Sequence, residues 1–159
     1  MKIVRFTPDR TEEVIALTHT AWTPVFARMQ GAVPKFVIDN FYPEGWPVRQ
    51  EADVRALLMD PATPVWLSLE GEAVTGFVGL RLHPEDRMGE IHILAVHPDH
   101  QRRGVGRALL AHGLSELKAS GCAMAMVETG GDPGHAPSRA TYEAAGFERW
   151  PVARYFRPL

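Results

Sequence analysis

The sequence predicts an α/β fold with a mixed, mostly antiparallel central sheet of about six to seven strands, flanked by about four helices. Three observations indicate this class. Alternating apolar residues around a Glu-Gly-Glu turn are typical of an antiparallel hairpin over residues 65–82. An apolar strand at residues 88–96 is followed by a helix and a further strand, the order of a right-handed crossover. A chain of 159 residues with 45% hydrophobic side chains suits a single domain over residues 1–159.

The first part of the chain predicts one strand and two helices before the hairpin. Residues 2–6 have the composition of a short strand. Apolar residues at helical spacing predict a helix over residues 11–29, interrupted or kinked near Pro24. Residues 31–48 are rich in proline, glycine and aromatic side chains, and they predict an irregular loop that leads into a short helix over residues 49–59. A loop of this length in a compact domain is often functional.

The second part of the chain predicts two further helices. One runs from Gly104 to about Ser120, with its leucines on one face, and ends at Gly121. The remaining segments are a buried strand at residues 122–129, a loop at 130–137, a helix at 138–146 and a final strand or hairpin arm at 147–159.

The net charge and the cysteine content indicate which binding partners and which cellular compartment to expect. The formal net charge is -2, whereas a protein that binds nucleic acid mainly through phosphates is usually more basic. The N-terminus lacks the apolar segment of a signal peptide, and no apolar run is long enough to span a membrane. Cys122 is the only cysteine, which favours a reducing compartment. The histidines show no metal-ligand spacing. We therefore predict a cytoplasmic protein without a nucleic-acid, membrane or metal partner.

The segment Gln-Arg-Arg-Gly-Val-Gly, residues 101–106, connects the 88–96 strand to the next helix. The first turn of a helix carries unpaired N–H groups and a partial positive charge. Gly104 and Gly106 let a ligand approach this backbone closely, and Arg102 and Arg103 add positive charge. The segment therefore predicts an anion site suited to a phosphate or pyrophosphate. It lacks the Gly-Lys-Ser/Thr ending of a Walker A loop and the third glycine of a dinucleotide fingerprint.

These residues also resemble a known protein family. Residues 101–106 match the Q/R-x-x-G-x-G/A motif of the GNAT family of N-acetyltransferases. The preceding Glu-Ile-His-Ile-Leu-Ala-Val strand resembles the fourth strand of that family and its bulge region. Residues 141–147, Thr-Tyr-Glu-Ala-Ala-Gly-Phe, resemble the Leu-Tyr-Glu-Lys-x-Gly-Phe segment of the family. The element order also fits the GNAT fold, and the three motifs in this order are together highly specific.

The resemblance implies acetyl-coenzyme A as the acetyl donor. Its pyrophosphate would contact the backbone of residues 102–107, and its pantetheine arm would pair with the strand like an added strand. The acetyl carbonyl would lie near an opening between the fourth and fifth strands, with the Val96 N–H or a neighbour as oxyanion donor. The family often has an asparagine seven residues before the tyrosine, a contact that His135 or Ser138 could replace here. The implied coenzyme contacts are Leu94, Ala95, Val96, Gln101, Arg102, Arg103, Gly104, Val105, Gly106, Arg107, Ala108, His135, Ser138 and Tyr142.

Three residues are candidates for the chemistry of acyl transfer, which needs a proton acceptor for the amine and a proton donor for the thiolate. Glu90 stands where several family members carry a general base, acting directly or through water; a solvent-facing strand residue is the alternative. His92 could orient or share the proton, or it could simply pack. Tyr142 matches the family tyrosine that points at the coenzyme sulfur, and a core aromatic is the alternative.

The acceptor side is less defined. Trp22, Phe26 and Trp46 lie in the region that covers the acceptor in the family, and they could hold an apolar or cationic group or form a small satellite core. Asp132 and His135, in the loop before the last helix, could also face the acceptor. The candidate acceptor residues are Trp22, Phe26, Trp46, Glu90 and Asp132.

The predicted function is acetyl transfer from acetyl-coenzyme A to the primary amine of a small molecule. A protein N-terminus, a lysine or an aminoacyl-tRNA is the alternative acceptor, and the slight negative charge argues against tRNA. A non-catalytic sensor that binds acyl-coenzyme A is an alternative class, which the presence of both Glu90 and Tyr142 disfavours. The exposed edges of a small sheet and the final strand also lead us to expect a homodimer.

Overall fold

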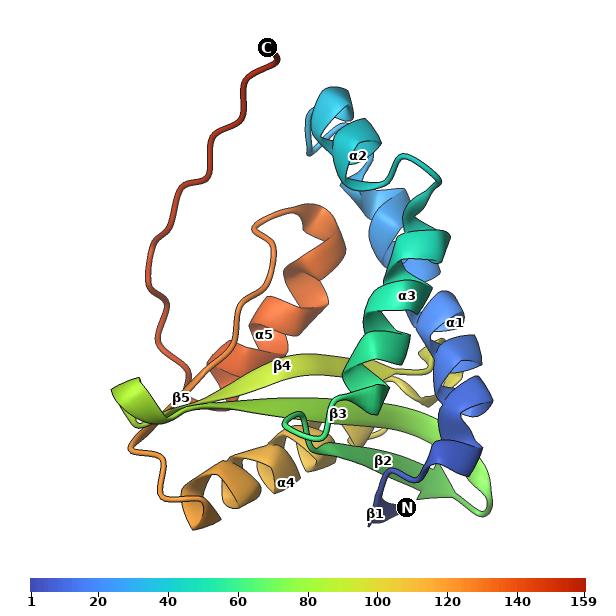
Figure 1. Ribbon diagram of the computed structural model, residues 1–159, viewed down its shortest axis with the longest axis vertical. Coiled ribbons are helices and arrows are strands. Elements are labelled where there is room, and N and C mark those ends of the chain that lie inside the picture. Colours follow the sequence, from blue (N-terminus) through green and yellow to red (C-terminus); the bar gives the residue numbers. More distant parts are fainter.

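A five-stranded sheet with the strand order β1-β2-β3-β4-β5 lies at the centre of the protein in the computed structural model, which describes residues 1–159 (Figure 1). The first four strands pair antiparallel, and β5 pairs parallel with β4. The predicted mixed, mostly antiparallel α/β sheet is therefore confirmed. The strands are β1 (Lys2–Arg5), β2 (Val65–Glu70), β3 (Ala73–His83), β4 (Met88–Val96) and β5 (Met124–Met126).

Five helices accompany the sheet. α4 lies on one face, whereas α1, α3 and α5 lie on the other (Figure 1). α4 connects β4 to β5, so the predicted strand–helix–strand crossover is present. The prediction for residues 11–29 is confirmed as one helix with Pro24 inside it. The helices are α1 (Thr11–Met29), α2 (Lys35–Phe41), α3 (Trp46–Met59), α4 (Val105–Ala119) and α5 (Ala136–Ala144).

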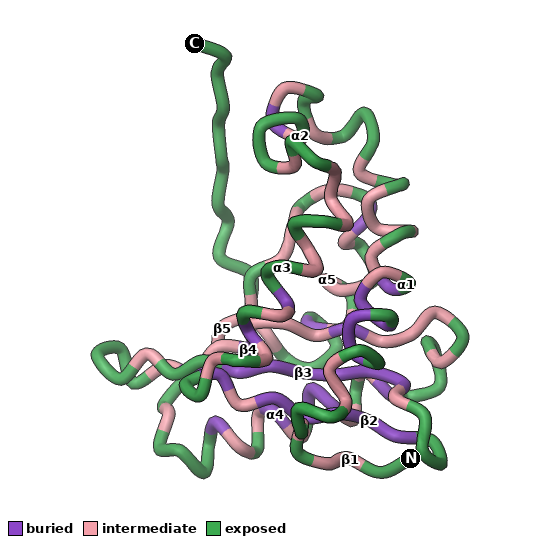
Figure 2. Tube along the Cα trace, turned by 45° about the vertical axis from the view of Figure 1, so that its right-hand side comes forward, coloured by how far each residue is buried: buried purple, intermediate pink, exposed green.

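Apolar side chains form two cores, one on each face of the sheet, and the longest buried stretches lie on β2 and β3 (Figure 2). In the core under α1 and α3, Val14 and Phe77 are 0% exposed. In the core over α4, Val78 and Leu109 are likewise 0% exposed. Burial of each such side chain contributes roughly 1.5–3 kcal/mol to folding. Packing on both faces of the sheet therefore fixes the positions of β3 and β4, and with them the side chains at the ends of these strands.

β4 separates from β5 part of the way along its length. Their pairing ends at Glu90 and Met126, while β4 continues beside β3 to Val96. We call the resulting opening the β4–β5 fork; residues 91–96 of β4 form one side, and the chain after Met126 forms the other. The β3–β4 register also shifts, because Leu80 pairs with Ile91 and Gly79 with Ile93, so that His92 is the extra residue of a bulge.

The sheet has five strands rather than six or seven, because residues 147–159 form no strand. Pro151 and Pro158 have no N–H to give to a sheet. The segment instead extends away from the sheet as an arm (Figure 1), and the ring of Phe156 packs edge-on against Phe41 of α2, with centroids 5.8 Å apart. β5 is also shorter than predicted.

The predicted loop over residues 31–48 contains an additional helix, α2, and α3 begins at Trp46 instead of residue 49. An ion pair of Lys35 Nζ with Asp39 at 2.6 Å spans one turn of α2. The prolines and glycines of this region lie at the helix ends, and so they delimit helices rather than exclude them. None of the helices is long and apolar enough to cross a membrane.

Candidate active site

The N-terminus of α4 presents a row of backbone N–H groups that no protein group uses. The first hydrogen bond at this end of the helix runs from the Ala108 N–H to the Gly104 carbonyl at 3.0 Å, and none uses an N–H of residues 102–107. Gly104 adopts φ 86°, a left-handed conformation that turns the chain into the helix, and there is open space where a Cβ would be. Unpaired N–H groups at a helix N-terminus attract anions, so this turn has the chemistry of a phosphate site.

The arginines beside this turn differ in their partners. Arg103 is bound to Glu70 at the end of β2, with 2.9 Å between its Nη2 and Glu70 Oε1. Arg102, which has φ 60°, and Arg107 form no ion pair within the protein. Gln101 donates a hydrogen bond from its amide to the Val96 carbonyl at 3.1 Å and so ties the turn to the end of β4. Arg102 and Arg107 are therefore the cations free to pair with a bound anion.

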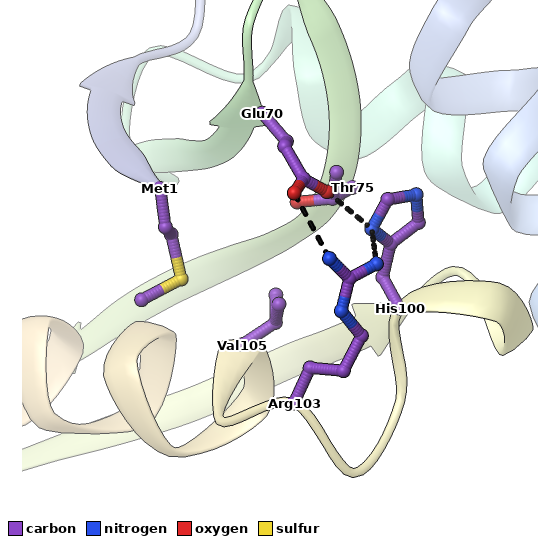
Figure 3. Close-up of a pocket in the computed structure, with 6 residues that line it drawn as sticks. All are labelled: Met1, Glu70, Thr75, His100, Arg103 and Val105. Carbon is purple, nitrogen blue, oxygen red and sulfur yellow. Dashed lines mark hydrogen bonds and ion pairs between the residues drawn. The ribbon is translucent and has the colours of Figure 1, made fainter.

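A small pocket of about 110 Å³ lies beside the turn, and Glu70 is one of the six residues that line it (Figure 3). One carboxylate oxygen of Glu70 pairs with Arg103, and the other lies 2.9 Å from His100 Nδ1. Figure 3 shows the guanidinium of Arg103 and the ring of His100 both pointing toward this carboxylate. Glu70 thus neutralises Arg103 and holds its guanidinium beside the turn.

The backbone of β4 next to the fork is available for an extended ligand. The His97 N–H donates to the Thr75 carbonyl of the β3 segment at 2.9 Å. Backbone groups alternate in direction along a strand, so Ala95 also faces β3 while Leu94 and Val96 face the fork. The predicted opening between the fourth and fifth strands therefore has main-chain groups along one side that pair with no strand; of these, the Val96 carbonyl accepts the hydrogen bond from Gln101.

Glu90 lies between two imidazole rings. His83 Nε2, from the end of β3, is 2.7 Å from Glu90 Oε2, and His92 Nδ1 is 2.9 Å from Glu90 Oε1. The Glu90 side chain is 14% exposed. Its neighbour Ile91 packs into the α4 core, so Glu90 points to the opposite face, which α1 and α3 cover. The structure brings the predicted pair Glu90 and His92 together and adds His83.

The protonation of this cluster follows from its hydrogen bonds. Burial opposes the charge of Glu90, but hydrogen bonds from His92 and His83 outweigh it, and the pKa of the carboxyl lies below its ordinary value. An ionised carboxylate only accepts hydrogen bonds, so both ring nitrogens that face it carry hydrogen. In a neutral His92 ring the lone pair is then on Nε2. An imidazole is intrinsically the stronger base of the two groups, so the pair has the form of a base oriented by a carboxylate.

Tyr142 reaches across the fork. It belongs to α5, yet its ring packs in the same core as Val105 and Leu109 of α4, on the opposite face of the sheet (Figure 1). The residue is 8% exposed, and burial raises the pKa of its phenol to about 12. The hydroxyl has no hydrogen-bond partner, and His112 Nε2 is the only side-chain polar atom that is both unpartnered and fully buried. The Tyr142 hydroxyl is therefore not fully buried.

The loop between β5 and α5 is fixed by its own side chains. Asp132 Oδ1 accepts a hydrogen bond from the Gly134 N–H at 2.8 Å, and Oδ2 lies 2.7 Å from His135 Nδ1. Burial opposes the charge of Asp132, but these hydrogen bonds, with that of His135 the strongest, lower the pKa of the carboxyl. Arg139 donates to the carbonyls of Gly130 and Asp132 at 2.6 and 2.7 Å. Asp132 therefore has a structural role in holding this loop.

The aromatic residues predicted for the acceptor side divide into two groups. Phe26 and Trp46 stack with their ring centroids 4.7 Å apart, and Tyr42 packs edge-on against Phe26. Trp22 instead packs against the core under α1 and α3. The Asp132 loop packs on the same end of α1, because a Cβ on Gly134 would lie 2.5 Å from the Val25 carbonyl oxygen.

An open groove of about 530 Å³ lies alongside the middle of α1. Its wall consists of His19, Thr20, Thr23 and Pro24 of α1, with Pro98 from the turn after β4 on the other side. These residues are polar or small, and none of them was a candidate site residue from the sequence.

Sequence reasoning missed His83 and the group formed by Glu70, His100 and Arg103. The hairpin register contains the signal for His83, since Arg81 lies opposite Glu90 and His83 is then two residues away on the same face. The group of Glu70, His100 and Arg103 joins segments about thirty residues apart in the sequence, and no local sequence pattern indicates it.

Comparison with known proteins defines the class to which this fold and site belong. The sequence profile of the acetyltransferase (GNAT) family matches residues 36–147, which include β2 to α5. The protein belongs to this family. The mycothiol acetyltransferase of Streptomyces coelicolor is 31% identical over 118 residues, 74% of this chain and 33% of that protein. The chain thus spans about a third of the length of this relative.

Solved structures of two acetyltransferases share the fold. An aminoglycoside N-acetyltransferase in complex with coenzyme A has a TM-score of 0.68 and 16% identity, with 99% of this chain and 93% of the other covered. An alanine N-acetyltransferase of a ribosomal protein, from Escherichia coli, has a TM-score of 0.70 and 21% identity, with 99% and 84% covered. One of these acts on a small molecule and the other on a protein, so the fold by itself does not define the acceptor.

Proposed function

We propose that the protein transfers the acetyl group of acetyl-coenzyme A to the primary amine of a small molecule. The observation that supports the proposal is the β4–β5 fork: the Glu90–His92 pair lies where the pairing of β4 with β5 ends, and β4 leads from there to the turn with the unpaired N–H groups before α4. An anion cradle, a base and a phenol are the groups that acetyl transfer from a thioester requires. Family membership supports the same reaction.

The coenzyme would be bound by main-chain groups of the protein more than by side chains. The N–H groups of residues 102–107 would hold its pyrophosphate, with Arg102 and Arg107 as counter-charges. The fork-facing backbone of Leu94 and Val96 would pair with the pantetheine arm, and the Val96 N–H would stabilise the oxyanion. Gln101 and the helix residues up to Ala108 would shape the cradle, with His135 or Ser138 at the position of the asparagine that the family often carries.

The reaction would proceed by direct attack. The amine nitrogen bonds to the thioester carbonyl carbon, the carbon–sulfur bond breaks, and coenzyme A leaves as a thiolate. The proton lost by the amine goes to the Glu90–His92 pair, directly or through water, with the lone pair of His92 Nε2 as the acceptor that the hydrogen bonds favour. The products are the acetylated amine and coenzyme A.

Tyr142 would donate its hydroxyl hydrogen toward the departing sulfur. A thiol has an ordinary pKa of about 8.5, so complete transfer from a phenol with a pKa of about 12 would be uphill by about 5 kcal/mol. Tyr142 therefore stabilises the thiolate first by a hydrogen bond, and the proton moves only as negative charge builds up on sulfur.

The related proteins and the surface along α1 support a small-molecule amine as the acceptor. One relative, which matches 74% of this chain, is a mycothiol acetyltransferase. The groove along α1 and the stacked Phe26 and Trp46 could contact a polyhydroxylated or cationic amine. Peptide N-termini, lysines and aminoacyl-tRNA remain the alternative acceptors.

The test is an amine panel assayed for thiol release from acetyl-coenzyme A, with the product identified by mass spectrometry. The panel should include aminoglycosides, amino sugars, polyamines and a peptide with a free N-terminus. Acetylation of a small amine at a rate above the amine-free background supports the proposal. Acetylation of the peptide alone would identify a protein acetyltransferase, and coenzyme binding without transfer to any amine would favour a sensor; either outcome overturns the proposal.

A further inference from the structure

We propose that His83 is a positioning residue of the acetyl-transfer site, which holds one oxygen of Glu90 so that the other oxygen fixes the tautomer of His92. The inference rests on the function proposed above and extends the site to a strand that none of the sequence motifs includes. It concerns the orientation of the base rather than contact with the substrate.

The hairpin register places His83 beside Glu90. His83 is the last residue of β3 and pairs with Met88, while Arg81 pairs with Glu90, so His83 is the diagonal neighbour of Glu90 on the same face. A short turn joins the strands, closed by a hydrogen bond from the Arg87 N–H to the Pro84 carbonyl at 3.1 Å. The 2.7 Å contact between His83 Nε2 and Glu90 Oε2 is therefore set by regular strand pairing.

His92 has less support from the strand than its neighbours. As the extra residue of the bulge it has no register partner on β3, and its side-chain hydrogen bond within the protein is the one to Glu90 Oε1. A glutamate carboxylate rotates readily about its last torsion. A donor on Oε2 therefore leaves Oε1 as the acceptor for His92 Nδ1, in the way that carboxylates orient catalytic imidazoles.

Two alternative roles for the cluster fit the structure less well. The three side chains do not form a group with the arrangement of metal ligands. A purely surface role for His83 is disfavoured because its ring lies between two carboxylates, with Nδ1 4.0 Å from Glu85 and Nε2 2.7 Å from the much less exposed Glu90.

The test compares His83→Leu, which removes the donor, with His83→Gln, which keeps an N–H donor on a side chain of similar reach. His112→Leu is the control, because it removes a histidine of α4 that packs against Trp66 of β2, a strand separated from β4 by β3. Long-range ¹H–¹⁵N NMR spectra of the substrate-free proteins report the tautomer of each histidine ring. Steady-state kinetics with a panel-derived amine give kcat and KM for each variant, and circular dichroism confirms folding.

We expect the wild type, His83→Gln and the control to keep His92 with hydrogen on Nδ1. In His83→Leu the His92 signals should move to averaged tautomers, and kcat should fall about 10- to 100-fold with KM for acetyl-coenzyme A unchanged. An unchanged His92 tautomer in His83→Leu would overturn the proposal, as would equal loss of kcat in both His83 variants. The NMR result does not need turnover, so a wild type that fails to acetylate amines would contradict the proposed function without deciding the role of His83.

Discussion

Glu90 and Tyr142 differ in how their hydrogen bonds compensate for burial. Burial alone would raise the pKa of both side chains. Two imidazoles donate to Glu90, and the pKa of its carboxyl falls below the ordinary value. Tyr142 has no such partner, and the pKa of its phenol rises to about 12. At neutral pH the fork therefore contains an ionised carboxylate beside His92 and a protonated phenol, which are the states that proton removal and proton donation need.

Replacement of Glu90 by Gln should destabilise the protein by about 1.5–3 kcal/mol at pH 7, because hydrogen bonds to a charged acceptor are lost. The folded-state pKa of Glu90 lies below its unfolded value near 4.5, so its charge stabilises the fold above that pH, and this contribution is lost as the pH falls through the lowered pKa. The stability difference between wild type and E90Q should therefore shrink below about pH 4.5. Urea unfolding at a series of pH values measures it, and a difference that does not change with pH would show that the charge is not stabilised.

Replacement of Tyr142 by Phe should lower kcat about 100-fold, the usual contribution of a positioned proton donor. Affinity for acetyl-coenzyme A should change little, because only the hydroxyl is removed. The melting temperature should not fall, since the hydroxyl has no hydrogen-bond partner in the protein. Stopped assays and calorimetry separate the two effects. Unchanged kcat would remove Tyr142 from the chemistry.

β4 is the element on which the site depends. Its first part pairs on both sides and carries Glu90, and its last part pairs only with β3 and opens into the fork. Close packing against α4 holds it there: a Cβ on Gly76 of β3 would lie 2.7 Å from the Ala95 carbonyl oxygen and 2.9 Å from Leu109 Cδ1. These tight contacts lie on the β3 side of β4, opposite the fork.

Gly76→Ala should destabilise the protein by about 1–3 kcal/mol, because a backbone atom of β4 must move to make room for the methyl group. Gly131→Ala is the matched control, since nothing lies within 4 Å of a Cβ there and its φ is not positive. Thermal unfolding of the two variants tests this. Equal melting temperatures would contradict the close approach of β3, β4 and α4.

The whole molecule has its two candidate binding regions in different layers. The proposed coenzyme cradle is at the N-terminus of α4, on one face of the sheet, whereas α1, α2 and the Asp132 loop, the candidate acceptor region, lie on the other (Figure 1). The arm of residues 147–159 meets α2 through Phe156, and the Arg154–Glu128 ion pair of 3.0 Å ties it to the chain after β5. The single domain over residues 1–159, the homodimer and the cytoplasmic location stay predictions.

The sequence predicted the features that local patterns encode. Period-two alternation specified the hairpin, helical spacing specified α1 and α4, and glycine with arginine at residues 101–106 specified the unpaired turn before α4. Contacts between distant segments could not be predicted in this way, because the pairing of Arg103 with Glu70 depends on how β2 lies beside the turn. The predicted final strand was wrong because Pro151 and Pro158 have no N–H to donate to a sheet, and the segment forms no strand.

The central claim is that the N-terminus of α4 binds the pyrophosphate of acetyl-coenzyme A, and isothermal titration calorimetry tests it most directly. Gly104→Asp and Gly104→Asn place side chains of nearly equal shape at φ 86°, a conformation that both tolerate better than other residues, and they differ mainly in charge. We predict one bound acetyl-coenzyme A per wild-type chain, modest weakening in the Asn variant and at least about tenfold further weakening in the Asp variant, equal to about 1.4 kcal/mol. Equal affinity of the Asp and Asn variants would contradict the claim, because a carboxylate among these N–H groups must repel a bound pyrophosphate.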